Sequence, residues 1–355
     1  MRSPVAVATK AGGLYFLFFN SRCIGKKENA MPSPTTSLAT LRPDLATFLE
    51  FDLESEKAGY IATQVFPVIN VMSQAGSFGK IPIEQLLQSR DTKRAPGSGY
   101  ARGNWTFTKA TYATEEHGAE EPVDDREAKM YAEYFQAEQI STLRAFSAVL
   151  RNAEQRVADA VFNATTWNGA SLTTAVGTEW STIATAVPLT NVEAAVQKIY
   201  DNSGLWANAL VINRKVFRNL RRCAQIIDAI EATGAGSPAK ASDVTTQMLA
   251  QVFDLEHVIV AGTSKNSAAE GQAATPAQIW SSEYAMVCKI ATGPDMRDPC
   301  IGRTFHWSDD GSSIGGTVES YREESIRGDV IRVRHDVDEI VLYTEAGHLL
   351  SNITA

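Results

Sequence analysis

The stretch "GKIPIEQLLQSRDTKRAPGSGYARGNWTFTKATYAT" (79–114) decides the fold prediction, because apolar and polar residues alternate at both of its ends. The alternating apolar residues are Ile81, Ile83, Trp105 and Phe107. Its middle, residues 89–104, carries four basic groups, three glycines and a proline, and so cannot bury itself. The stretch therefore predicts a β-hairpin with a long basic tip, and loops of this length in compact domains are usually functional.

The segment from Asp124 to Trp167 changes to helical spacing and contains neither glycine nor proline. Apolar residues such as Leu150 and Val157 recur at the interval of a helix. Asp124 fits the N-cap position, with Glu127 at the third helical residue completing a capping box. One long helix, or two joined helices, is predicted here as a structural spine.

The remaining elements alternate between helices and strands. Upstream of the hairpin, residues 62–72 predict a strand, with Pro67 marking an edge or an end. Asn191 is predicted to cap a helix that Gly204 terminates. The further predicted helices are 214–223 and 245–253, the predicted strands are 205–213, 256–262 and 277–290, and 317–353 is predicted to be antiparallel β with turns near 327–328 and 346–347.

Composition excludes several classes of function. The chain has 355 residues, 44% hydrophobic and 21% charged, as soluble globular proteins do. A net charge of −8 argues against a free-standing nucleic-acid binder, since phosphate attraction needs a basic surface. Cys23, Cys223, Cys288 and Cys300 show no CxxC spacing, so reduced thiols are predicted.

The N-terminal segment is predicted not to belong to the folded protein. Its apolar run "GLYFLFF" is too short for a signal-peptide core or a membrane span. "KKENAM" (26–31) can be encoded as AAG-AAG-GAG-AAC-GCN-ATG, which contains the ribosome-binding sequence AAGGAG shortly before a start codon. We therefore expect translation to begin at Met31, with residues 1–30 a mis-called extension.

The stretch "EEHGAEEPVDDREAK" (115–129) holds one histidine and seven carboxylates. It could be a metal or acid/base site around His117, or the acidic approach to a helix. Gly118 and Pro122 interrupt the approach, so few carboxylates would share a face with His117. Because negative charge is favourable at a helix N-terminus, we favour the start of a helix that also forms inter-subunit salt bridges.

The other candidates for chemistry are weak. The sequence contains no GxGxxG, GxxxxGK[ST], GxSxG or HExxH motif. His335 with Asp336 and Asp338 could form a carboxylate-oriented base, but alternation within "IRVRHDVDEIV" favours a solvated strand face. The basic residues of 214–222 form a helical stripe for which a solvated face is favoured, with contact to a neighbour's acidic patch as the second interpretation and DNA as the third.

From about Leu41 to the C-terminus the chain resembles the major capsid proteins of tailed bacteriophages. The resemblance rests on the order of six stretches rather than on any one of them. They are "VFPVINVMSQAGSFGKIPIEQLL", "TYATEEHGAEEPVDDREAKMY", "NSGLWANALVINRKVFRNL", "VFDLEHVIVAG", "QIWSSEYAMVCKI" and "YREESIRGDVIRVRHDVDEIVLY".

The resemblance implies an α+β fold of the Hong Kong 97 type. Laid on this chain, it gives an N-terminal arm (31–62), an extended β-hairpin loop (63–118), a peripheral domain with a long spine helix (119–189 and 320–355), and a mixed αβ axial domain (190–319). Some family members carry a long scaffolding segment near the N-terminus. Only about ten residues separate Met31 from Leu41, so scaffolding is expected from a separate protein or not at all.

The resemblance also implies the function: a non-enzymatic major capsid protein of the virion. It would assemble in the host bacterial cytoplasm, without cofactor, metal or membrane, into hexamers and pentamers of an icosahedral shell around double-stranded DNA. The implied partners are other copies, a portal, a separate scaffolding protein and possible decoration proteins. The candidate interface residues are Arg90, Lys93, Arg94, Tyr100, Arg102, Trp105, Glu120, Glu121, Asp124 and Asp125.

Three alternatives stay open at this stage. One is an encapsulin, a protein nanocompartment of the same fold, although the long basic loop argues mildly against it. Another is a metal-dependent hydrolase using the acidic cluster at His117. Within the capsid interpretation, Lys93 could cross-link to a neighbour's asparagine, as in some family members. That reaction is disfavoured, since lysine must first lose a proton from a pKa near about 10.4 and no partner asparagine can be assigned.

Overall fold

The computed structural model describes residues 40–41, 59–89, 91–100, 102–104, 106–131, 136–232, 243–269, 271–309 and 314–354. These residues lie in one compact unit that spans Leu38–Ala355. The predicted extension, residues 1–30, and all but a few residues of the predicted arm lie outside the described residues, and so does the expected start at Met31.

The first sheet is organised around β14 (Gly328–Val341), a 14-residue strand. The strand order is β1-β13-β14-β12-β2, and β5 also pairs with β14. The other strands are β1 (Thr40–Leu41), β2 (Val68–Val71), β5 (Glu115–Asp124), β12 (Gly302–Trp307) and β13 (Thr317–Glu323). β14 is antiparallel to β5, β12 and β13, whereas β2 is parallel to β12, so one long strand unites segments from distant parts of the sequence.

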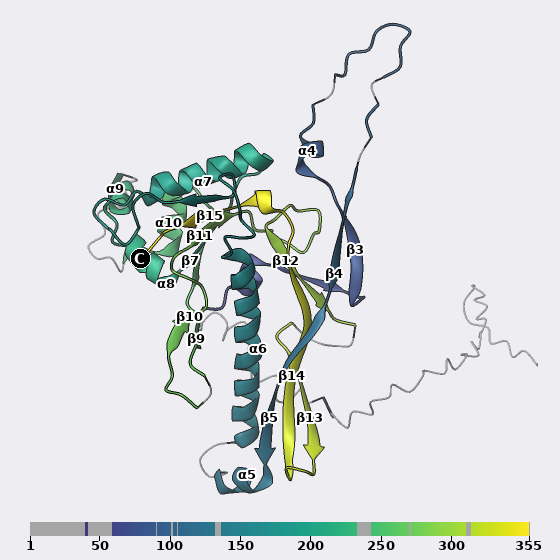
Figure 1. Cartoon of the computed structure of the whole chain (residues 1–355), viewed down its shortest axis with the longest axis vertical. Helices are drawn as coiled ribbons and strands as arrows, with labels where there is room; N and C mark the ends of the chain where they lie inside the picture. The colour runs from purple at the N-terminus through teal and green to yellow at the C-terminus, as the bar shows by residue number, and fades with distance from the viewer. Residues whose placement is uncertain are drawn as a thin grey trace, which may run out of the picture. The chain divides into compact units, whose positions relative to one another are not determined.

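The predicted spine is confirmed as the 25-residue helix α6 (Ala137–Val161), which lies alongside β5 and β14 (Figure 1). Its first half packs Phe146 and Val149 against Ile331 and Val333 of the first sheet. Its last turns join a different core, which contains Trp280. A single helix therefore contributes to two hydrophobic cores, since apolar residues recur on it at the helical period.

The second sheet has the order β6-β15-β11-β7-β8. Its strands are β6 (Thr173–Ala175), β7 (Ala209–Asn213), β8 (His257–Ala261), β11 (Ala285–Cys288) and β15 (Gly347–Ser351). Four helices accompany it: α7 (Pro188–Ser203), α8 (Arg214–Leu220), α9 (Ala224–Ala232) and α10 (Thr246–Val252). β7 and β11 are buried along their whole length, so this sheet forms the centre of the largest core.

The predicted hairpin is present, but its paired strands lie nearer the base of the loop than expected. They are β3 (Ala75–Lys80) and β4 (Thr108–Ala113), antiparallel over six residue pairs. Ile83 instead begins α4 (Ile83–Leu86), whose N-cap is Pro82. Pro82 has no N–H to donate to a ladder, so the strand ends before it.

Two other predicted strands need correction. The strand predicted at 62–72 is a short helix, α3 (Ala62–Val65), followed by β2, so Pro67 precedes the strand. The long strand predicted at 277–290 is divided into β10 (Pro276–Gln278), which pairs with β9 (Ser264–Asn266), and β11. A turn closed by the Glu283 N–H donating to Ser281 Oγ (3.1 Å) separates them.

Asn191 is not a helix cap. α7 begins at Pro188, which suits the first helical turn, and the Asn191 amide oxygen accepts a hydrogen bond from Trp180 Nε1 at 3.2 Å. The predicted end of the helix is confirmed, because Gly204 has φ 69° and the left-handed conformation that favours glycine.

The predicted capping residue Asp124 is confirmed. Its Oδ1 accepts hydrogen bonds from the backbone N–H groups of Arg126 (2.7 Å) and Glu127 (3.2 Å) at the start of α5 (Asp125–Tyr131). α5 and α6 are separate helices, so of the two predicted arrangements, one long helix or two joined helices, the second is confirmed.

The domain boundaries remain predictions, and sheet membership gives a different division at three strands. β12, inside the predicted axial range, lies in the first sheet, whereas β6 and β15, inside the predicted peripheral ranges, lie in the second. A short helix, η2 (Thr344–Ala346), joins β14 to β15. The chain therefore crosses between the sheets just before its C-terminal strand.

Two further observations concern membrane spans and the cysteines. Among the described residues no helix is both long and apolar enough to cross a membrane. Cys223, Cys288 and Cys300 are free and buried, and burial raises the pKa of the Cys288 thiol, which keeps it protonated. Cys23 lies outside the described residues.

Candidate subunit interface

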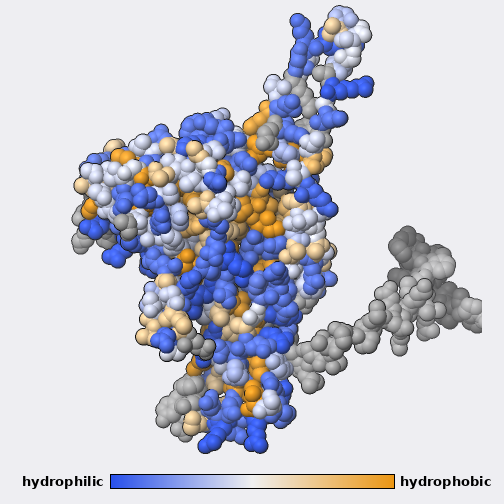
Figure 2. Space-filling model, viewed as in Figure 1, coloured by the Kyte–Doolittle hydropathy of each residue, from blue (hydrophilic) through white to orange (hydrophobic). Residues whose placement is uncertain are grey.

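The loop between β3 and β4 projects from the sheets in Figure 1 and ends in a hydrophilic tip in Figure 2. Four predicted interface residues of the tip are described, and all are exposed: Lys93, Arg94, Tyr100 and Arg102. Arg90 and Trp105 lie outside the described residues. The tip therefore offers cations and one aromatic ring to solvent, and none of its described residues belongs to a hydrophobic core.

The tip contains a small turn of its own. The N–H of Ser98 donates to the Ala95 carbonyl at 3.1 Å, and Arg94 Nε donates to the Ser98 carbonyl at 2.7 Å. The Arg94 guanidinium also lies 4.9 Å from the centre of the Tyr100 ring, a cation–π contact. These contacts form a local turn, here called the tip knob (residues 93–100 and 102), in a segment that composition alone predicts to be irregular.

The base of the loop is anchored, in contrast to its tip. Tyr112 stacks on Phe305 of β12 with ring centroids 4.8 Å apart. The Ala113 N–H donates to Asp338 Oδ2 at 2.8 Å, and Lys80 Nζ donates to the Leu342 carbonyl. The loop therefore leaves the body from a fixed direction, which positions the tip knob without covering it.

The acidic stretch 115–124 is a strand, β5, that leads directly into α5. The predicted helix start at Asp124 and Asp125 is confirmed, whereas the predicted interrupted approach is wrong. β5 pairs antiparallel with β14 over ten residues, with His117 opposite His335. Side chains alternate along it, and Val123 packs into the same core as Phe146 of α6. The period is hard to recognise in the sequence because two of the four inward positions, His117 and Glu121, are polar, and because Pro122 resembles a break. Since β5 pairs with β14 on one side, a proline is tolerated there.

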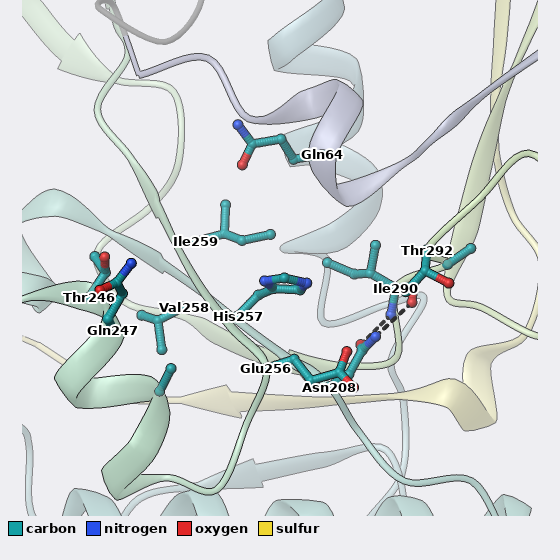
Figure 3. A pocket seen from close by; sticks show the side chains of 12 residues that line it. Gln64, Asn208, Thr246, Gln247, Glu256, His257, Val258, Ile259, Ile290 and Thr292 are labelled. Carbon is teal, nitrogen blue, oxygen red and sulfur yellow. Dashed lines mark hydrogen bonds between the residues drawn. The ribbon is translucent and has the colours of Figure 1, made fainter.

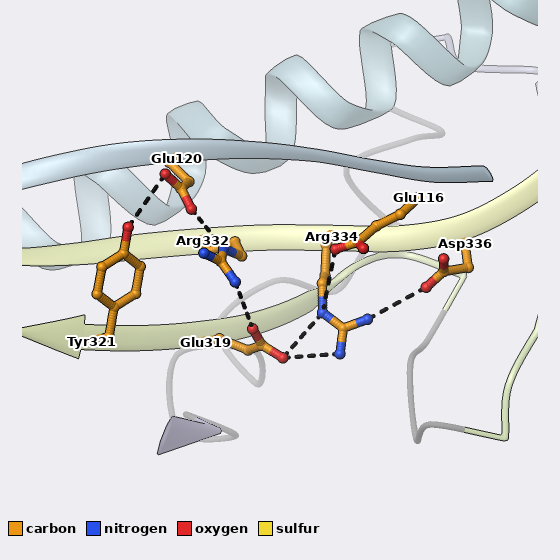
Figure 4. A network of polar contacts seen from close by, with 7 residues as sticks. All are labelled: Glu116, Glu120, Glu319, Tyr321, Arg332, Arg334 and Asp336. Carbon is orange, nitrogen blue, oxygen red and sulfur yellow. Dashed lines mark hydrogen bonds and ion pairs between the residues drawn. The ribbon is translucent and has the colours of Figure 1, made fainter. Parts of the chain in front are cut away.

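The acidic residues of β5 face arginines of the same chain. The network joins Glu116, Glu120, Glu319, Tyr321, Arg332, Arg334 and Asp336 from β5, β13 and β14 (Figure 4). Arg332 Nε lies 2.6 Å from Glu120 Oε1, and Arg334 Nη2 lies 3.0 Å from Glu319 Oε1. Glu120 raises the pKa of the Arg332 guanidinium by accepting this hydrogen bond.

The remaining acidic candidates also have partners within the chain. Arg144 lies 3.6 Å from Glu121, and Arg322 lies 2.6 Å from Asp125, whose pKa this guanidinium lowers. Asp124 caps α5. An inter-subunit role for these residues stays a prediction, and the contacts within the subunit give them a structural role that needs no second copy.

His335 is buried, with 2% of its surface exposed, so the predicted solvated face is wrong. Asp336 is buried as well, and its neighbour Arg334 lies 3.4 Å away. Burial is the main cause that lowers the pKa of His335 to about 4, and the nearby Arg156 guanidinium contributes to this lowering. The imidazole is therefore neutral near pH 7, with Nδ1 3.2 Å from the Ile314 carbonyl and Nε2 3.4 Å from Arg156 Nη2.

His117 lies edge-on to His335, with ring centroids 6.1 Å apart, rather than among converging carboxylates. Burial is the main cause that lowers its pKa. In the part of the chain that the structure describes, no three residues among histidine, cysteine, aspartate and glutamate converge as a metal site would require. The geometry around His117 does not support the hydrolase alternative.

Glu154, which the sequence analysis missed, is the most densely bonded buried carboxylate of the described chain. It lies on α6 with 1% of its surface exposed. Its oxygens accept hydrogen bonds from the Ile61 N–H (3.0 Å), the Ala62 N–H (2.8 Å) and Trp280 Nε1. Burial raises its pKa, and these hydrogen bonds oppose the rise. The spacing of α6 marks position 154 as inward-facing, but nothing local identifies its partners.

Comparison with known proteins agrees with this architecture. No family model matches the chain. It is 23% identical over 296 residues to the major capsid protein of Pseudomonas phage JBD67, covering 83% of this chain and 92% of the relative. The major capsid protein of Burkholderia phage BcepMu is also 23% identical, over 312 residues, with the same shares covered.

Solved structures give the same fold. A phage-related protein from Bordetella bronchiseptica superposes with a TM-score of 0.65 and 19% identity, covering 89% of this chain and 98% of that one. The capsid of the cyanophage P-SCSP1u gives 0.52 and 13%, covering 81% and 86%. The predicted α+β fold of the Hong Kong 97 type is confirmed.

The predicted resemblance to phage major capsid proteins is likewise confirmed, and the chain is a capsid shell protein. The similarity to structural proteins implies a non-enzymatic role.

Proposed function

We propose that many copies of this chain close into the icosahedral head shell of a tailed phage or prophage, as hexamers and pentamers around double-stranded DNA. The observation that carries this proposal is the similarity to named major capsid proteins over 83% of the chain. The exposed tip of the β3–β4 loop supports it, because a neighbouring copy could cover that tip. Individually modest contacts suffice in such a shell, because avidity grows with the number of copies.

The finer parts of the proposal follow from the resemblance. Assembly takes place in the host cytoplasm and the finished shell belongs to the virion. A portal, a separate scaffolding protein and decoration proteins are its expected partners. The chain performs no catalysis and uses no cofactor. Its net charge of −8 fits a container that must not adhere to packed DNA.

Negative-stain microscopy of the purified chain tests the proposal. Closed particles of uniform size are expected, and particles recovered from an induced host should contain nuclease-protected DNA. A chain that stays monomeric at the concentrations where the phage relatives assemble would contradict the proposal. Particles that hold protein cargo and no nucleic acid would instead support the nanocompartment alternative.

A further inference from the structure

A groove lies at the start of β8, on the second sheet. Two adjoining hollows, of about 500 and about 550 Å³, share Asn208, Glu256, Ile290 and Thr292 in their walls. Figure 3 shows the first hollow, with His257 at its centre and Gln64 of α3 across from it. We call the two hollows together the β8 groove. Its volume falls in the range of sites that receive a ligand or a partner's side chains.

The walls of the groove are acidic, and they include an aromatic side chain. Three carboxylates line it, those of Asp254, Glu256 and Asp298, against one ammonium group, that of Lys289. Within the described chain, neither Asp254 nor Glu256 takes part in an ion pair. Trp206 lines the second hollow, with 61% of its surface exposed. A large exposed aromatic beside unpaired carboxylates is typical of a contact surface.

The groove is preformed rather than loose. The side chain of Asn208, itself 8% exposed, donates from Nδ2 to the Ile290 carbonyl (2.9 Å) and accepts from the Ile290 N–H (2.7 Å), as Figure 3 shows. The His257 N–H donates to the Asn208 carbonyl at 2.9 Å. Trp206 is held by stacking on Tyr200, with ring centroids 4.8 Å apart. Little ordering free energy is therefore needed when a partner enters.

Asp254 occupies a position that most side chains avoid. Its φ is 53°, in the left-handed region just after α10, where glycine is the usual residue. The turn is closed by the Leu255 N–H donating to the Ala250 carbonyl at 2.9 Å. The sequence therefore places a carboxylate on the wall of the groove at a conformation where it costs stability.

The tip knob matches the groove in charge and chemistry. Its described cations are Lys93, Arg94 and Arg102, preceded by one carboxylate, Asp91. The described tip therefore carries three cations and one anion, whereas the groove carries three anions and one cation. The Tyr100 ring, 71% exposed, offers an aromatic group to Trp206. Both surfaces are already shaped by their own hydrogen bonds, so the contact is between two preformed parts.

We propose that the tip knob of one copy docks into the β8 groove of a second copy, with Lys93 and Arg94 against Asp254 and Glu256 and with Tyr100 beside Trp206. β8 is the edge strand of the second sheet, beside β7, whereas the tip ends the separate β3–β4 hairpin, which projects away from the sheets in Figure 1, so the occupant comes from another chain. This inference rests on the proposed shell function and names the surface that the loop recognises.

The contact is heterologous, because a knob on one copy meets a groove on another and the same pair of surfaces repeats around the assembly. Heterologous contacts close into rings when the rotation between copies allows it. The knob and groove would therefore define both the direction and the closure of a capsomer ring.

Charge reversal with rescue tests the proposal on the full chain. The tip variant is Lys93→Glu with Arg94→Glu, the groove variant is Asp254→Lys with Glu256→Lys, and the third variant carries all four changes. Sedimentation measures self-association and negative-stain microscopy measures closed particles. Each two-site variant should need at least about tenfold more protein to associate, because like charges would face one another. The four-site variant should recover association close to the unaltered chain.

Matched controls use exposed charges elsewhere. Arg214→Glu with Arg218→Glu on α8 makes the same charge change as the tip variant, and should associate normally if the effect belongs to the knob. Normal association of both two-site variants would overturn the docking proposal while leaving the shell function standing. Loss in both without recovery in the four-site variant would also overturn it, since the two surfaces would then meet different partners. An unaltered chain that associates but never closes into particles would contradict the shell function alone.

Discussion

The β5–β14 pair and the β3–β4 hairpin are both antiparallel ribbons, but they differ in how they are anchored to the rest of the chain. β5–β14 lies on the core formed with α6, and arginines tie its outer face to the acidic side chains of β5 and β13. β3–β4 is fixed only at its base, against Phe305, and its tip contributes nothing to a core. The difference teaches that strand pairing alone does not anchor a ribbon; the surface beneath it does.

The largest expected effect concerns the anchored body. Glu154→Ala should reduce the free energy of unfolding by about 3–5 kcal/mol, because three buried donors, on Ile61, Ala62 and Trp280, lose their acceptor. Glu154→Gln keeps one oxygen acceptor and should cost markedly less. Urea unfolding of the subunit measures both, with the exposed Glu193→Ala on α7 as the matched control. Equal urea midpoints for Glu154→Ala and the control would show that the hydrogen bonds of Glu154 do not stabilise the anchored body.

Acidification should weaken the anchored body next. The pKa of His335 is about 4 in the folded chain, against an ordinary value of 6.5. As the pH falls from about 6.5 to about 4, the unfolded chain binds a proton that the folded chain refuses, so stability falls by up to about 3 kcal/mol. Burial also lowers the pKa of His348 to about 4, with the same sign.

The measurement is the thermal midpoint across this pH range for the unaltered chain and for His335→Asn. The variant should show a shallower decline. Burial raises the pKa of the Glu154 and Asp338 carboxyls, which act in the opposite sense and stabilise the fold as the pH falls. Because both chains contain these carboxyls, the difference between the two profiles isolates His335. Parallel profiles would show that His335 does not titrate as its burial requires.

A smaller effect is expected where β5 turns into α5. Asp124→Ala should cost about 1 kcal/mol, because the first turn of α5 loses the acceptor for the N–H groups of Arg126 and Glu127. Asp125→Ala should cost less, since its exposed pair with Arg322 is screened by water. Chemical unfolding of the two variants side by side checks the order. A larger loss for Asp125→Ala would mean that the ion pair, not the cap, holds this junction.

The smallest effect on stability is expected at the tip knob. Lys93→Gln with Arg94→Gln should leave the free energy of unfolding within about 0.5 kcal/mol, because both side chains are exposed. In the unaltered chain, trypsin should cleave free subunits at Lys93 or Arg94 and spare assembled shells. Equal protection in both states would show that the loop folds on its own subunit, and the contrast with the β5–β14 ribbon would disappear.

Several features were predictable because a local signal carries them. Gly204 ends α7 since a left-handed residue follows the last turn, and Asp124 caps α5 since its carboxylate reaches two N–H groups nearby in sequence. The spacing of apolar residues alone predicts a long helix where the 25-residue helix α6 forms. The basic, glycine-rich composition of 89–104 likewise predicts an exposed tip.

The errors share a cause, which is contact with residues far away in the sequence. α3 is helical where a strand was predicted, and Glu154, more than ninety residues on, accepts the N–H groups at its start. β5 looked like an interrupted approach to a helix until β14 supplied ten partners. His335 is buried because α6 covers its strand.

By itself the sequence determined the projecting hairpin, the spine helix and the acidic balance of the chain, because these depend on periodicity, turn chemistry and composition, and its resemblance to phage major capsid proteins implied the class of fold. Tertiary structure alone decided which acidic residues are paired within the subunit, which histidines are neutral, and where Asp254, Glu256 and Trp206 meet to form the β8 groove. Hydrogen bonds and ion pairs act over a few ångströms in space, and a distance along the chain does not report which groups folding will bring that close.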